Sequence, residues 1–151
     1  MYWKGPKKEH SLEGFYLPVD GKLNEKNRWV ILAGLIPWEE FEDEYAKNFS
    51  SNDMGAPAKP FRMALGAEII KRKLDITDEE VVLQICENPY LQFFIGMESY
   101  SNEAPFDPSM MTHFRERLPL DLIKRVNERV IENENKKKRT ERNRAKRRRR
   151  K

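Results

Sequence analysis

The densest chemical feature of the sequence is a run of basic residues between positions 136 and 151. This run holds 12 of the 29 Lys and Arg residues and one of the 25 acidic residues, so its net charge is +11 and residues 1–135 carry −7. Guanidinium and ammonium groups at this density neutralise phosphates and displace their counterions. The sequence therefore predicts that a polyanion is bound by the following side chains: Lys136, Lys137, Lys138, Arg139, Arg142, Arg144, Lys146, Arg147, Arg148, Arg149, Arg150 and Lys151.

A second candidate contact surface lies in the segment 107–118, which opens with a cap-then-proline signature and is predicted to be helical. Its apolar residues fall on one face, and the rest of the surface carries Ser109, Thr112, His113, Arg115 and Arg117. Arg pairs bidentately with guanine, while Ser, Thr and His reach phosphates or base edges. The alternative is that Arg115 and Arg117 keep an amphipathic helix soluble and pair with nearby acids such as Glu116 or Asp121.

A third cluster, Lys71, Arg72 and Lys73, ends a predicted helix over residues 60–74. Cations at this end of a helix are also stabilised by the helix dipole, so the cluster has a structural explanation beside the phosphate-binding one.

Catalytic, metal and cofactor chemistry is not indicated. His10 and His113 have no acid–base partner close in sequence, and the one cysteine, Cys86, follows an apolar stripe. A single thiol builds neither a disulfide nor a thiolate metal site. The acidic residues recur on predicted helix surfaces, where a charge run is usually a solvated face. We therefore expect no catalytic residue, no metal ligand and no cofactor.

The elements that position these residues are predicted to be helices throughout. Apolar residues recur at helical spacing, and Pro, Asn, Thr and Gly residues divide the pattern into segments. The predicted helices cover residues 24–36, 37–49, 60–74, 78–87, 88–96, 107–118 and 119 onward. The turn-forming segment 50–57 is a candidate hinge. The fold class is therefore all-α, a compact bundle of about six or seven helices in which residues 78–118 form a helix-turn-helix-like part.

Three regions follow from this division: an extended lead-in over 1–23, a helical domain over 24–135, and a disordered basic tail over 136–151. The lead-in lacks the apolar stretch of a signal peptide, and no run of about 18 apolar residues occurs. We expect a cytoplasmic, nucleoid-associated protein that does not contact a membrane.

Three separated segments, GKLNEKNRWVILAGLIPWEEFEDEYAKNF (21–49), AKPFRMALGAEIIKRKLDITDEEVVLQICENPYLQFFIGM (58–97) and PFDPSMMTHFRERL (105–118), closely resemble the N-terminal helical domain of bacterial DDE-type insertion-sequence transposases. The resemblance covers about residues 14–130. In that family an RNase-H-like domain follows, whose acidic triad binds two Mg²⁺ ions for DNA strand cleavage and joining. Here the basic run stands where the first catalytic strand would begin, so the resemblance implies a chain that is not itself an enzyme.

The resemblance implies that the partners are the terminal repeats of the element's DNA and either full-length transposase or a second copy of the chain. Three functions remain open: a truncated DNA-binding and assembly module, an N-terminal fragment completed by a downstream reading frame, and a protein-interaction module that regulates transposition. The alternative explanation of the basic run is that it is an arbitrary sequence encoded at the end of a truncated or frameshifted reading frame.

Overall fold

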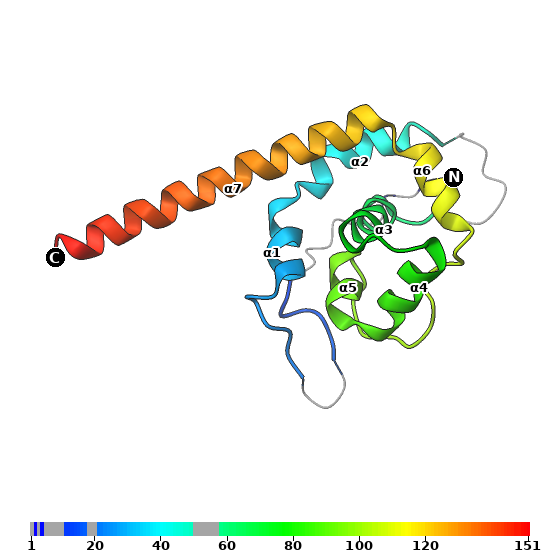
Figure 1. Ribbon diagram of the computed structural model, residues 1–151, viewed down its shortest axis with the longest axis horizontal. Helices are drawn as coiled ribbons and strands as arrows, with labels where there is room; N and C mark the ends of the chain where they lie inside the picture. Colours follow the sequence, from blue (N-terminus) through cyan, green and yellow to red (C-terminus); the bar gives the residue numbers. More distant parts are fainter. Residues whose placement is uncertain (1, 3, 5–10, 18–20, 50–57) are drawn as a thin grey trace.

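The computed structural model describes residues 2, 4, 11–17, 21–49 and 58–151. These residues form seven helices and contain no strand, which confirms the all-α class (Figure 1). Each predicted helical segment contains one helix. The helices are α1 (Arg28–Leu35), α2 (Trp38–Ala46), α3 (Phe61–Leu74), α4 (Asp78–Glu87), α5 (Pro89–Phe94), α6 (Met110–Arg117) and α7 (Leu120–Arg149).

Polar caps set the starts of three of these helices. Asn27 Oδ1 accepts a hydrogen bond from Trp29 N at 2.8 Å, and Asn88 Oδ1 accepts one from Tyr90 N at 2.9 Å. Thr77 Oγ1 accepts from Glu80 N at 3.2 Å, which is half of a reciprocal capping box. Each cap satisfies a backbone N–H that the helix itself leaves without a partner.

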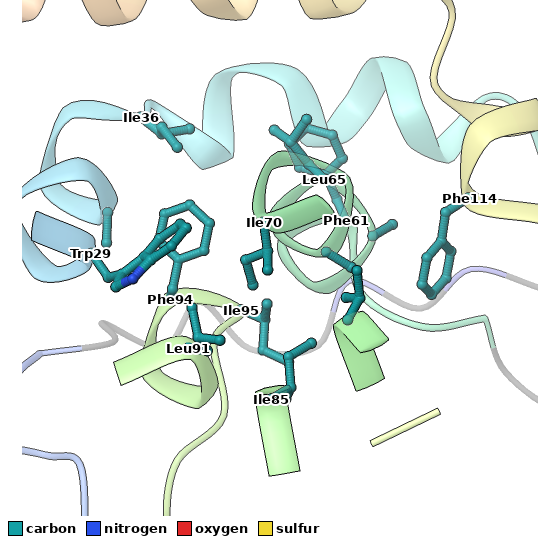
Figure 2. Close-up of a cluster of buried hydrophobic side chains, with 14 of the residues drawn as sticks. Trp29, Ile36, Phe61, Leu65, Ile70, Ile85, Leu91, Phe94, Ile95 and Phe114 are labelled. Atoms are coloured by element: carbon teal, nitrogen blue, oxygen red, sulfur yellow. The ribbon is translucent and has the colours of Figure 1, made fainter. Parts of the chain in front are cut away.

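Helix α3 is the centre of the core, because it packs against α2, α4 and α6. Figure 2 shows large side chains from the surrounding helices converging on it, among them Trp29, Ile85, Phe94 and Phe114. Gly66 lets the α5 end approach α3 closely, since a Cβ there would lie 2.9 Å from Ile95 Cγ2. Burial of these apolar surfaces is the main source of stability for the body.

Part of the lead-in is fixed to the body beside α5. Phe15 is buried and packs edge-on against Phe93, while the side chain of Tyr16 is 72% exposed. The backbone of Tyr16 pairs with the segment after α5, accepting from Tyr100 N at 3.0 Å and donating to Glu98 O at 3.1 Å.

Helix α7 runs without interruption from Leu120 to Arg149, so the prediction of a disordered basic tail is wrong. Its first half docks on the body through the buried side chains of Leu122 and Val126. That docking supplies the nucleus that an isolated helix lacks, and neither Gly nor Pro occurs after Pro119 to stop propagation. The residues from 134 onward are exposed, and they project from the body (Figure 1).

Two predictions are not decided by the fold. The hinge expected at residues 50–57 lies outside the described residues. Helices α4 and α6 both pack against α3, with α5 between them in the chain. The helix-turn-helix-like nature of this part stays a prediction.

Candidate nucleic-acid interface

Arg115 joins three helices through its guanidinium group. Nη1 and Nη2 donate to the two carboxylate oxygens of Asp78 on α4, both at 2.9 Å, and Nη1 also donates to Glu68 Oε1 on α3 at 3.2 Å. Nη2 lies 3.4 Å from Thr112 Oγ1 on its own helix. The donors of this side chain are therefore directed at partners inside the protein.

Hydrogen bonding to Arg115 and burial shift the pKa values of the two carboxyl groups in opposite directions. Hydrogen bonds from Arg115, and next from Lys71, hold the pKa of Asp78 at about 2, against desolvation. Glu68 is 3% exposed, and desolvation raises its pKa above the ordinary value although Arg115 opposes the shift. This cluster is a fixed junction between α3, α4 and α6, and Arg115 supplies its counter-charge.

Arg117 lies at the end of α6 against the end of α2. Its guanidinium carbon is 4.4 Å from the centroid of the Phe49 ring, a cation–π distance. Its carbonyl oxygen accepts a hydrogen bond from Asn48 Nδ2 at 2.8 Å. Arg117 is consequently half-buried, and it is held at the junction of these two helices.

Three other predicted contact residues of this region, Ser109, Thr112 and His113, have exposed side chains. Ser109 N donates to Asp107 Oδ1 at 2.9 Å, which fixes the entry of α6. His113 Nδ1 lies 3.7 Å from Glu116 Oε2, and both side chains are more than half exposed. These three residues are accessible to a ligand, whereas Arg115 and Arg117 have partners in the body.

The cluster at the end of α3 is divided. Lys71 Nζ binds Asp78 Oδ1 at 2.6 Å, so Lys71 belongs to the Arg115 junction. Arg72 and Lys73 are exposed in the last turn, three and two residues before Asp75, whose left-handed backbone (φ 52°) ends the helix. Only these two cations of the cluster are presented to solvent.

The basic run of residues 136–151, here called the basic arm, is exposed at every position. The arm is helical as far as Arg149, and ten of its twelve cationic side chains belong to this helix. In Figure 1 the arm points away from α6, and the first half of α7 lies between the arm and α6, the helix of Thr112 and His113. The structure thus places the predicted contacts in two separate regions.

A row of ion pairs holds the first half of α7 on the body. Arg125 pairs with Glu44 on α2 and with Asp121, and Arg129 pairs with Glu40 on α2 at 3.2 Å. Asn133 Nδ2 donates to Leu35 O at the end of α1 at 2.9 Å. Sequence reasoning missed this row, although the i, i+4, i+8 spacing of Arg125, Arg129 and Asn133 is a helical face.

Sequence reasoning also missed the partly buried cation Arg62. Its guanidinium donates to the carbonyls of Phe93 at 2.9 Å and Phe94 at 3.0 Å, and it lies over the rings of Trp38 and Phe93. Burial lowers the pKa of Arg62 to about 10. Because these carbonyls end α5, Arg62 caps the negative end of that helix and has a structural role.

Within the described residues, no group of three His, Cys, Asp or Glu side chains is placed to hold a metal ion. Searched over the same residues, no helix is both long and apolar enough to cross a membrane.

Fold and candidate contacts together define an acidic helical domain that carries a basic helical arm. Residues 17–117 match the model of a transposase domain family (DUF772), and the chain belongs to this family.

A relative described as an uncharacterized protein, ORF8 in the nfe locus of Rhizobium meliloti, is 40% identical over 100 residues, 66% of this chain and 47% of the relative. The chain therefore spans about half the length of the curated relative it matches. No solved structure matches the chain.

Proposed function

We propose that the chain is the DNA-binding and assembly domain of an insertion-sequence transposase, and that the basic arm is its principal contact with DNA. The observation that carries this proposal is the arm itself: a net charge of +11 on an exposed helix, attached to a body of opposite net charge. Membership of a transposase domain family supports DNA as the polyanion.

The charge distribution favours the arm over the rest of the surface. Residues 1–135 carry a net charge of −7, which repels a phosphate backbone at low salt. Arg115 and Lys71 are already paired with Asp78. Additional contacts would come from Arg72, Lys73 and the exposed polar residues of α6. These contacts would position the body on the duplex, while the arm supplies most of the affinity.

An equal-charge comparison tests this assignment. One variant replaces Arg147, Arg148, Arg149 and Arg150 with Gln, and the control replaces four exposed lysines outside the arm, Lys22, Lys26, Lys47 and Lys124, with Gln. Affinity is measured by fluorescence anisotropy of a labelled duplex at about 50 mM salt, where phosphate contacts are strong. We expect the arm variant to bind at least about tenfold more weakly than the control. Equal losses in the two variants would contradict a principal role for the arm.

A second candidate function is favoured by the length of the relative. Because the match covers 47% of that protein, this domain is compatible with a role inside a longer, catalytically active transposase. Its surface would then contact a catalytic domain, full-length transposase or a second copy of the chain. Translating the downstream DNA in all frames tests this alternative: a segment that continues the relative's sequence would support it, and random sequence would oppose it.

A further inference from the structure

The chemical groups of the basic arm are sorted around its helix axis. At about 100° per residue, positions 136, 140, 143, 147 and 150 fall within about 80° of arc. This front stripe consists of Lys136, Thr140, Asn143, Arg147 and Arg150. It contains Thr140 and Asn143, the two uncharged hydrogen-bonding side chains of the arm.

The opposite side of the helix has a different composition. The back stripe, again defined by helical spacing, consists of Glu134, Lys138, Glu141, Ala145 and Arg149. Glu141 is the one acid in the arm. Lys138 Nζ forms an ion pair with Glu134 Oε1 at 3.1 Å. The back stripe therefore carries no net charge, whereas the front stripe carries +3.

The two flanks between these stripes are cationic. One flank carries Lys137, Arg144 and Arg148, and the other carries Arg139, Arg142 and Lys146. A helix lying in a groove places its flanks against the phosphates of the two strands and its front against the base edges. Six flanking cations correspond to about six neutralised phosphates and a log–log salt slope near −5.

We infer that the basic arm lies in the major groove of duplex DNA and contacts base edges with its front stripe. This inference rests on the proposed function, and it deepens it by naming the groove and the side chains. An α-helix with its side chains is about 10–12 Å across, and the B-DNA major groove is about 12 Å wide. Residues 136–149 extend over about 21 Å at 1.5 Å per residue, with no body element beside them in Figure 1.

The front stripe carries the groups that distinguish bases. Asn pairs bidentately with adenine, and Arg pairs bidentately with guanine. Thr140 Oγ1 donates to Lys136 O at 3.0 Å, which leaves its oxygen lone pairs and its methyl group for a base edge. Double-stranded RNA does not fit this geometry, because its major groove is too narrow for side chains to enter.

The test selects binding sites from a duplex library with a randomised central segment, using the full chain. Arg147→Gln and Asn143→Ala alter the front stripe, and Arg148→Gln removes the same charge as Arg147→Gln from a flank. Helix content measured by circular dichroism confirms that all three variants remain folded. We expect the parent chain to enrich a sequence motif, and Arg147→Gln and Asn143→Ala to reduce its preference for that motif roughly 5-fold or more.

Arg148→Gln should keep the motif, weaken binding to all sequences alike and reduce the salt slope by about 1. Binding by the parent without an enriched motif would overturn the groove inference and leave the proposed function intact. Equal effects of Arg147→Gln and Arg148→Gln on the motif would overturn it too. Failure of the parent chain to bind any duplex would instead refute the proposed function.

Discussion

Replacing Arg115 with Ala distinguishes a structural junction from a DNA contact. The guanidinium of Arg115 is the group that links α6 to Asp78 on α4 and to Glu68 on α3. Without it, the buried carboxyl group of Glu68, which is 3% exposed, loses the cation that balances its charge. We therefore expect Arg115→Ala to lower the free energy of unfolding.

The size of this effect follows from the exposure of each partner. Removing one member of a fully buried pair costs about 3–5 kcal/mol, whereas an exposed pair contributes about 0–1 kcal/mol. The side chain of Arg115 is 38% exposed and that of Asp78 is 22% exposed, so only the Glu68 side approaches the buried limit. We expect a loss of about 2–3 kcal/mol, which at about 1–3 kcal/mol per molar urea moves the unfolding midpoint by about 0.7–3 M.

Urea unfolding followed by circular dichroism measures this loss. Arg139→Ala, on the exposed arm, is the matched control and should change stability by less than about 0.5 kcal/mol. Adding Glu68→Gln to Arg115→Ala removes the buried charge and should restore part of the stability, because neutral amides cost less to bury than carboxylates. An Arg115→Ala protein as stable as the control, but with tenfold weaker DNA binding, would refute the structural role.

Three further predictions concern the fold. The pKa of Asp78 is depressed to about 2, so the carboxylate's contribution to stability is complete above the unfolded-state pKa near 4 and is lost as pH falls towards 2. The urea midpoint should therefore fall less steeply between pH 5 and pH 2 in Asp78→Asn than in the parent chain. Gly96→Ala should cost about 1–3 kcal/mol in the same assay at neutral pH, because φ is +85° and the new Cβ would lie 3.0 Å from Arg62 Cδ; an unchanged midpoint would contradict this. Leu122→Ala should cost about 2–5 kcal/mol, because Leu122 is fully buried where α7 docks; if the loss is below about 1 kcal/mol, α7 does not depend on this contact.

The helices could be predicted because their signals are local. Asn27, Thr77 and Asn88 begin helices that their side chains cap, and Pro89 stands in the first turn of α5. Apolar spacing then identified the buried faces, since a helical period places such residues on one side. These signals lie within a few residues of the elements they determine.

The order of the basic arm could not be predicted from the same local signals. A dense run of like charges buries no apolar surface, which favours disorder in an isolated segment. In the structure the run continues a helix that Leu122, Val126 and the Arg125 ion pairs have already fixed to the body. The nucleus of the helix is therefore tertiary, and it lies outside the run itself.

The partners of Arg115 could not be predicted either, because they too depend on tertiary packing. Sequence reasoning placed Glu116 and Asp121 beside it, whereas its partners Asp78 and Glu68 lie 37 and 47 residues away. Only the packing of α6 on α3 and α4 brings these groups together. The DNA contacts predicted for the exposed residues stay predictions that binding measurements can decide.

The salt dependence of DNA binding tests the central claim most directly. The equilibrium constant of the full chain for a duplex is measured by anisotropy between about 50 and 200 mM salt, and its logarithm is plotted against the logarithm of salt concentration. Six phosphates neutralised by the arm predict a slope near −5, and the variant with Gln at residues 147–150 should have a clearly shallower slope. A slope near zero, or the same slope in both proteins, would contradict DNA binding through the basic arm.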